Sequence, residues 1–332
     1  MFKHHMKYVK IFTFSIATAT VFFSCSEGVV ERDSNETGLN PLNKSSYKMA
    51  LVPVEMNSWM AGLQDNISIS KISIPGTHDS GARIDAPVVT GTAKTQNLSI
   101  AEQLNAGVRF LDIRCRHIDN SFTIHHGAIY QNLNFDDVLN ACYAFLASHP
   151  SETIIMSVKE EHDASNTTRS FESTFDSYIQ KNPSKWDLGT TIPTLGEVRG
   201  KIKLLRRFSS GASKGINATS WADNTTFEIN NPGAQLKIQD YYKVSNNDDK
   251  WNGISNLFNE AKSSSSSNRL FINFTSGYKP GIFGIPSIPT VSNAINPKLK
   301  TFFQSNTKGS YGIMPVDFVN TELAELIVKT NF

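Results

Sequence analysis

Short apolar runs of β type alternate with amphipathic helical patterns along most of this chain, and this alternation limits the folds it can adopt. The series begins with KISIPG at residues 71–76 and ends with YGIMPVDF at 311–318, before a last helical stretch, TELAELIVKT. Strand–helix alternation over about 280 residues has the size of a β/α barrel. A doubly wound open sheet is the alternative, although no glycine-rich phosphate loop follows the first strand. We therefore predict an α/β fold and favour a barrel.

Each apolar run ends in polar side chains. The first run delivers His78 and Asp79, and the last delivers Asp317. The runs between them end in residues of the same kinds, namely Asp112 and Arg114, His125 and His126, Lys159 to Glu161, Arg206 and Arg207, and Asp240 to Tyr242. All strands of a parallel barrel open their carboxyl ends onto one face, where active sites are built. The sequence therefore predicts a polar, catalytic barrel mouth.

These residue types favour phosphoryl chemistry by acid–base catalysis. Two histidines suggest a base and an acid, because imidazole exchanges protons near neutral pH. Arg114 offers a planar, permanently charged fork that suits a phosphate. Serine or cysteine does not occur in a nucleophile-elbow pattern, and neither HExxH nor metal-ligand cysteine spacing occurs. The nucleophile would then be water or a hydroxyl of the substrate.

Composition excludes some classes of protein. The formal net charge is +2, so there is no electrostatic footprint for nucleic acid. The chain is 39% hydrophobic and 19% charged over 332 residues, which is ordinary for a globular protein. Cys115 and Cys142 occur in apolar settings, and we expect them to be buried, unpaired thiols rather than a disulfide.

The N-terminus has the pattern of an export signal. Basic MFKHHMKYVK precedes apolar IFTFSIATATVFF, which is too short for a bilayer span, and Ser24–Cys25 follows. Cys25 is placed as in a bacterial lipobox, although Phe22–Phe23 departs from the usual residues. We predict a lipoprotein or export signal at 1–25 with lipidation of Cys25, a flexible tether at 26–50 and one catalytic domain at 51–332. A plain secretory signal is the alternative.

A series of motifs resembles the bacterial phosphatidylinositol-specific phospholipases C of the metal-independent type. The motifs run in order from about Trp59 to the C-terminus: SIPGTHDSG, GVRFLDIRCR, HHG, SVKEEH, KIKLLRRF, IQDYYKVS, LFINFTSGY and PVDF. The resemblance implies a distorted, incompletely closed β/α barrel of the TIM type. It also implies attack of the inositol 2-hydroxyl on the adjacent phosphodiester, giving diacylglycerol and inositol 1,2-cyclic phosphate. A nucleophile within the substrate would explain the missing nucleophilic serine or cysteine.

The resemblance also implies roles for the two histidines. His78 in GTHDS matches the general base, and Asp317 in PVDF matches the carboxylate that orients it. His126, the second histidine of HHG, matches the general acid, with Asp79 as its partner.

The phosphate and the inositol have their own matching residues. Arg114 in DIR matches the cation on the phosphate oxygens, with Asp112 beside it. Residues that match contacts to the inositol are Lys159, Arg207 and Asp240 for its hydroxyls and Tyr242 for its face. Because a guanidinium supplies the field that a metal gives calcium-dependent relatives, we predict no metal or other cofactor. Glu160 and Glu161 would point to opposite faces of a strand and make a poor calcium pair.

The expected partners are phosphatidylinositol or a glycosylated phosphatidylinositol anchor at a membrane surface, with the protein a monomer. Two segments are candidates for a membrane-contacting rim. Residues 81–98, where the family places a helix, have only a weak helical pattern. In the loop 278–289 we expect four apolar side chains to be exposed between prolines, namely Ile282, Phe283, Ile285 and Ile288. The strand before HHG leads into a loop shorter than the family's. Two other functions stay open: a glycerophosphodiesterase-like barrel with a glutamate-rich calcium site, and a non-catalytic, lipid-binding surface lipoprotein.

Overall fold

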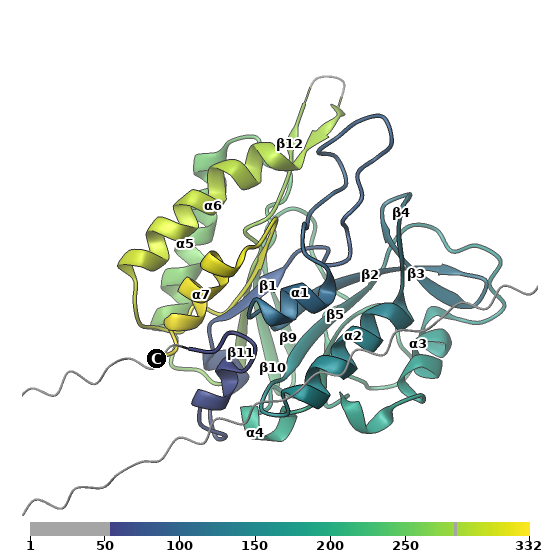
Figure 1. Ribbon diagram of the computed structural model, residues 1–332, viewed down its shortest axis with the longest axis horizontal. Coiled ribbons are helices and arrows are strands. Elements are labelled where there is room, and N and C mark those ends of the chain that lie inside the picture. Colours follow the sequence, from purple (N-terminus) through teal and green to yellow (C-terminus); the bar gives the residue numbers. More distant parts are fainter. Residues whose placement is uncertain (1–53, 282–283) are drawn as a thin grey trace, which may run out of the picture. The chain divides into compact units, whose positions relative to one another are not determined.

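A mostly parallel sheet forms the centre of the computed structural model, which describes residues 54–281 and 284–332 (Figure 1). The predicted signal with Cys25, the predicted tether and residues 282 and 283 lie outside the described residues. Along the sheet the strands are β6 (Trp186–Asp187), β7 (Ile202–Arg207), β5 (Ile154–Glu160), β2 (Phe110–Ile118), β1 (Ile74–Thr77), β14 (Ile313–Val316), β11 (Arg269–Asn273), β10 (Ala234–Gln239) and β9 (Thr226–Asn231). All are parallel except β9, which pairs antiparallel with β10.

The sheet curls into a barrel that is not closed by backbone pairing. Within the described residues, β9 pairs only with β10, and the short β8 (Ile216–Asn217) pairs only with β7. A side chain spans the gap, because Asn231 Nδ2 donates to the Asn217 carbonyl at 2.7 Å. The predicted α/β fold with a distorted, incompletely closed barrel of the TIM type is confirmed.

Alternation along the strands separates two hydrophobic cores. Phe110 and Ile155 belong to the core inside the barrel, whereas Leu111 and Met156 belong to the core between sheet and helices. Both faces of the strands are therefore buried, which is why they are continuous apolar runs in the sequence. Inward-facing positions recur at every second residue, so a strand that is apolar inside the barrel presents its next inward side chains at the mouth.

Helices cover the outside of the sheet (Figure 1). They are α1 (Ile100–Asn105), α2 (Phe135–Ser148), α3 (Phe171–Ile179), α4 (Leu195–Val198), α5 (Asn247–Ser263), α6 (Ile288–Ser305) and α7 (Thr321–Lys329), with short 3-10 helices η1 (Trp59–Gly62), η2 (Ile69–Lys71) and η3 (Pro183–Lys185). Capping boxes fix several N-termini, such as Ser99 with Glu102 in α1. Among the described residues, no helix is long and apolar enough to cross a bilayer. Cys115 and Cys142 are buried free thiols, as predicted.

One strand differs from the prediction. β3 (Ser121–His126), expected among the parallel strands, instead folds back antiparallel on β2 and pairs with β4 (Ile129–Asn134), which the sequence analysis missed. Only two residues separate β2 from β3, too few for the crossover that a parallel connection needs. His126 therefore approaches the barrel mouth from outside the parallel sheet.

The two candidate rim segments lie side by side. Residues 82–98 form an irregular loop without a helix, and the Ile288 N–H donates to the Gly91 carbonyl at 2.9 Å. The hairpin β12 (Lys279–Pro280) and β13 (Pro286–Ser287) rises next to this loop (Figure 1). Ile285 is 44% exposed, as expected, but Ile288 is only 3% exposed because it begins α6 and packs inward. The expectation of an exposed Ile288 was wrong.

Candidate active site

A cavity of about 500 Å³ opens at the carboxyl ends of the strands. The inward alternation of the strands leads directly into it. Phe110 in the barrel core is followed by Asp112 and Arg114, and Ile155 is followed by Lys159. The cavity is lined by seven of the predicted residues: His78, Arg114, His126, Lys159, Arg207, Asp240 and Tyr242. The other three predicted residues of the barrel mouth, Asp79, Asp112 and Asp317, are buried.

His78 is held by a buried carboxylate. Its Nδ1 lies 2.8 Å from Asp317 Oδ1, and Asp317 is 1% exposed. The other carboxylate oxygen accepts the Gly277 N–H at 3.2 Å, which fixes the carboxylate in turn. A carboxylate can only accept, so Nδ1 carries the proton and Nε2 of the neutral ring keeps its lone pair. His78 therefore has the geometry of an oriented base.

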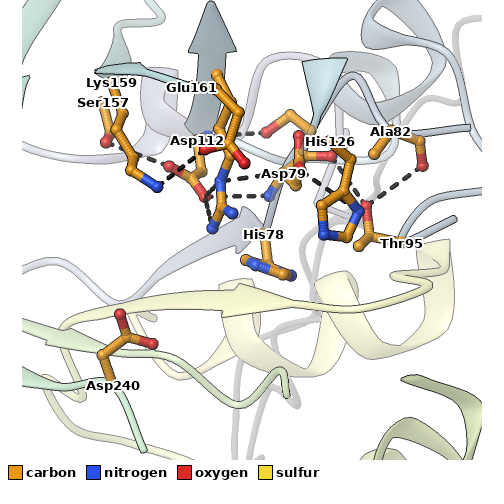
Figure 2. A network of polar contacts seen from close by, with 12 residues as sticks. His78, Asp79, Ala82, Thr95, Asp112, His126, Ser157, Lys159, Glu161 and Asp240 are labelled. Carbon is orange, nitrogen blue, oxygen red and sulfur yellow. Dashed lines mark hydrogen bonds and ion pairs between the residues drawn. The ribbon is translucent and has the colours of Figure 1, made fainter. Parts of the chain in front are cut away.

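His126 is held by a backbone carbonyl. Its Nδ1 lies 2.5 Å from the Ala93 oxygen and 3.7 Å from Asp79 Oδ2. A carbonyl also only accepts, so Nδ1 again carries the proton and Nε2 is left for a ligand. Burial and the neighbouring Arg114 charge lower the pKa of His126, against the Ala93 hydrogen bond. Figure 2 shows Lys159 and His126 reaching from two sides toward the space near His78.

Asp112 organises the cationic side of the cavity. Its Oδ2 accepts from Arg114 Nε and Nη2, both at 3.1 Å, and its Oδ1 lies 3.4 Å from Arg207 Nη1. Burial would raise the pKa of Asp112, but these two guanidinium groups outweigh it and hold the pKa well below its usual range. Burial would likewise lower the pKa of Arg114, and the surrounding carboxylates, Asp112 first, raise it. Arg114 is thus a fixed cation at the cavity wall.

Asp79 is the least satisfied carboxylate of the site. It is fully buried at a positive φ of 39°, and neither oxygen has a hydrogen-bond partner among the described residues. Its nearest charged neighbours are His126 and Arg114, whose Nε lies 3.8 Å away. Burial raises the pKa of Asp79 to about 7, against the attraction of Arg114. Burial thus shifts the pKa of Asp79 upward and the pKa of His126 downward, so that it disfavours the charged form of each.

Two further groups belong to the site: Trp221, which the sequence analysis missed, and Glu161, which it placed at the barrel mouth without a role. Trp221 Nε1 donates to Asp240 Oδ2 at 2.9 Å, while the Arg207 guanidinium lies 3.6 Å from the centroid of a Trp221 ring. Glu161 accepts from Lys159 Nζ at 2.8 Å and from the Gly127 N–H at 3.0 Å. Trp221 follows no predicted strand, so a search for polar residues at the ends of strands could not find it. Glu161 has the inward alternation of Lys159, so its contact with Lys159 could have been predicted from the strand pattern.

No metal site is evident in the part of the chain that the structure describes. Among these residues, no group of three or more histidine, cysteine or acidic side chains is arranged to hold a metal ion. Two of the acidic side chains around the cavity, Asp112 and Glu161, are engaged by arginine and lysine instead. Independence from metals stays a prediction.

The comparisons with known proteins agree with this geometry. Residues 72–208 match the family model described as phosphatidylinositol-specific phospholipase C, X domain. The 1-phosphatidylinositol phosphodiesterase of Staphylococcus aureus (strain Newman) is 36% identical over 275 residues, covering 79% of this chain and 88% of the relative. The protein of the same name from Listeria monocytogenes is 29% identical over 288 residues, covering 84% of this chain and 86% of the relative.

Solved structures extend the similarity to the whole barrel. A structure of the S. aureus phosphatidylinositol-specific phospholipase C, concerned with the modulation of its membrane binding, has a TM-score of 0.74 at 33% identity. It covers 84% of this chain and 98% of the S. aureus chain. By sequence and by fold, this chain belongs to the family of bacterial phosphatidylinositol-specific phospholipases C.

Proposed function

We propose that this protein is a phosphatidylinositol-specific phospholipase C that releases diacylglycerol and leaves inositol 1,2-cyclic phosphate. One observation carries the proposal. Two imidazoles, each with Nδ1 bound to an acceptor, line the same cavity as a fixed guanidinium. A base, an acid and a phosphate-binding cation are what an in-line transfer between two hydroxyl oxygens requires.

The first proton transfer is assigned to His78. Nε2 takes the proton of the inositol 2-hydroxyl, whose oxygen attacks the adjacent phosphorus. Asp317, buried behind the ring, stabilises the imidazolium that forms. Because the nucleophile is part of the substrate, its attack on phosphorus is intramolecular, which removes most of the entropy cost of bringing the reactants together.

The second proton transfer is assigned to His126. The bond between phosphorus and the diacylglycerol oxygen breaks, and protonated His126 gives its Nε2 proton to that oxygen, so the leaving group departs as an alcohol. Arg114 faces the non-bridging oxygens and stabilises the charge that develops on them. Asp112 and Asp79 keep this guanidinium in place.

The inositol ring is assigned to the remainder of the cavity. Lys159, Arg207 and Asp240 offer donors and acceptors for its hydroxyls, and Tyr242 offers a ring face. Trp221 would keep Arg207 and Asp240 in register by stacking on one and donating to the other.

Phosphorus NMR of the products from phosphatidylinositol vesicles tests the function. The expected product is the cyclic phosphate, formed equally fast with and without a chelator. A glycerophosphodiesterase-like enzyme would use water, give no cyclic phosphate and lose activity in the chelator. A non-catalytic lipid-binding protein would give no product at all.

We further propose that the mouth of the cavity lies against a membrane. Val88, Val89 and Ile285, here called the rim, are 92%, 38% and 44% exposed. They belong to the two neighbouring segments joined by the contact of Ile288 with Gly91. Exposed apolar side chains gathered at the opening of a cavity are typical of lipid contact.

We also propose export and an anchor at Cys25, with the barrel acting as a monomer. The support is the order of a basic segment, an apolar segment and Ser24–Cys25. Metabolic labelling with a fatty acid checks this. The wild-type chain should take up label, and Cys25→Ser should be found unlabelled.

A further inference from the structure

The loop that follows β1 is organised by a single carboxylate. Asp85 Oδ1 accepts the N–H groups of Thr92, Ala93 and Lys94 at 3.1, 2.9 and 2.9 Å. Its Oδ2 accepts the Gly91 N–H at 2.7 Å. The N–H groups of residues 91–94 therefore converge on one side chain, and the backbone of this stretch curls around it. Burial would raise the pKa of Asp85, but these hydrogen bonds outweigh it and lower the pKa.

The same stretch of backbone meets the active site. The Ala93 carbonyl, next to an N–H that Asp85 holds, accepts from His126 Nδ1 at 2.5 Å. Two residues after Ala93, Thr95 donates its hydroxyl to the Asp79 carbonyl at 2.9 Å, and Gln96 Nε2 donates to the His78 carbonyl at 2.9 Å. Figure 2 shows the Thr95 hydroxyl with its contacts to Asp79 and Ala82. This loop thus has contacts to both predicted catalytic histidines.

We propose that Asp85 is a positioning residue for the general acid, because it holds the Ala93 carbonyl at the point where that carbonyl fixes the tautomer and the orientation of His126. The proposal rests on the proposed function, in which His126 gives a proton to the leaving group.

Other hydrogen bonds hold the two ends of this stretch: the Ile288 N–H donates to the Gly91 carbonyl, and the N–H groups of Thr95 and Gln96 donate to the Ala82 carbonyl. Between these ends, the N–H groups of residues 92–94 are held by Asp85. Residues 82–98 contain neither helix nor strand, and Val88 and Val89 at the turn are exposed rather than packed. Along the chain, residues 86–90 are joined to Ala93 through Gly91 and Thr92, whose N–H groups donate to Asp85. Without the carboxylate, four backbone N–H groups lose their acceptor at once. An amide group that lacks a partner favours a different local backbone, and the Ala93 carbonyl would move with it.

The dependence of kcat on the leaving group distinguishes a role in general-acid catalysis from a merely structural role. Protonation of the leaving oxygen matters greatly for an alkoxide and little for a nitrophenolate, which departs without a proton. The test uses two soluble, monomeric esters of inositol phosphate, one with a short alkyl alcohol and one with nitrophenol, so that membrane binding plays no part. For Asp85→Ala we expect kcat on the alkyl ester to fall about 10-fold to 100-fold, which is part of the roughly 10²-fold to 10⁴-fold effect of a general acid, because His126 itself is still present. On the nitrophenyl ester the fall should stay below about 3-fold.

Asp85→Asn is the conservative variant. Its one side-chain oxygen can still accept some of the four N–H groups, so the loss should be intermediate between wild type and Asp85→Ala. Glu172→Gln is the matched control. Glu172 also collects backbone N–H groups, from Gly211 at 2.8 Å and Ala212 at 3.4 Å, but it lines a separate cleft. It should leave the ratio of the two substrates unchanged.

Combination with His126→Ala completes the test. If Asp85 acts only through His126, the double variant should lose no more activity on the alkyl ester than His126→Ala alone. Equal losses on both esters for Asp85→Ala and Asp85→Asn, or additive losses in the double variant, would overturn the proposal. If His126→Ala itself fails to discriminate between the esters, the acid assignment in the proposed function falls instead.

Discussion

The two halves of the active site are built in different ways. His78 and Asp317 follow neighbouring parallel strands, β1 and β14, in which Thr77 is paired with Val316. The register of the sheet therefore places the base and its carboxylate side by side. His126 comes from an antiparallel hairpin outside the parallel sheet, and its partner is the carbonyl of an irregular loop. The base belongs to the barrel, and the acid is brought to it.

This difference has consequences for robustness. The positions of His78 and Asp317 rest on strand pairing and a buried core. Their geometry should therefore tolerate changes in surface loops. The acid depends on the hairpin β3–β4, the loop 82–98 and Asp79, which have no common element of secondary structure. Changes remote from the chemistry should therefore affect proton donation more readily than proton abstraction.

Removal of each histidine should give the largest effects and separates the two halves. We expect His78→Ala and His126→Ala to lower kcat on phosphatidylinositol by at least about a hundredfold and up to about 10⁴-fold. On a nitrophenyl ester His126→Ala should recover most of the wild-type rate, because that leaving group needs no proton, while His78→Ala should not. Circular dichroism should show both variants folded. A recovery in His78→Ala would exchange the two roles.

Replacement of the guanidinium tests what both halves share. Arg114→Lys should lower kcat by about 10²-fold to 10³-fold on either ester, because a point charge cannot reproduce the two-pronged contact to phosphate. Arg116→Lys, on the same strand, is the control. The Arg116 Nε donates to the Asp163 carbonyl in an exposed position, and its replacement should be silent. A loss confined to the alkyl ester would assign Arg114 to the acid alone.

The base half could be predicted from the sequence and the acid half only in part. Because β1 and β14 are parallel neighbours, the residues that follow their carboxyl ends lie side by side. The pattern of polar residues after each apolar run therefore predicted both His78 and Asp317. The same pattern gave His125 and His126 without a choice between them, and it assumed a parallel strand. Ile124 packs in the outer core, so strict alternation would turn His126 outward as well. The hairpin is irregular between Thr123 and His125, and His126 lines the cavity.

The hydrogen-bond acceptor of His126 could not be predicted: the expected partner, Asp79, lies 3.7 Å from Nδ1, and the Ala93 carbonyl accepts from Nδ1 instead. A backbone carbonyl such as that of Ala93 leaves no trace in residue type, and Asp85 has the sequence signature of an ordinary loop aspartate. The role of Trp221 could not be predicted either, because Trp221 lies in a connection without regular secondary structure. Pairing of strands and alternation of side chains are coded locally, whereas contacts between two irregular segments are set by the complete fold.

The pH dependence of stability should sharpen the contrast between the two carboxylates. The pKa of Asp79 rises from 3.8 to about 7 on folding. Between these values the folded state binds more protons than the unfolded state, so stability falls as pH rises. Asp79→Asn cannot ionise and escapes this loss. Its free energy of unfolding should exceed that of wild type by an amount that grows from pH 4 and levels off above pH 7, with an upper bound on the order of 4 kcal/mol, and its melting temperature should rise in parallel.

The measurement is a series of thermal melts of both proteins across this pH range. A constant difference would mean that burial does not control the ionisation of Asp79. A lower stability of Asp79→Asn at pH 8 would mean that its attraction to Arg114 and His126 outweighs its desolvation.

The rim should give the smallest effect, and it separates membrane contact from chemistry. Val88→Ser and Ile285→Ser should each lower activity on phosphatidylinositol vesicles about 3-fold to 10-fold, since each removes on the order of 1 kcal/mol of apolar burial. Activity on the soluble esters should not change, because neither side chain contacts a catalytic group. Phe332→Ser is the control, since Phe332 is 41% exposed but lies beside Gly62, and neither residue lines the cavity. If Val88→Ser also slowed the alkyl ester, the tip of the loop would act on His126 through the backbone that Asp85 holds. The acid half of the site would then extend to the membrane surface, while the base half stays within the barrel.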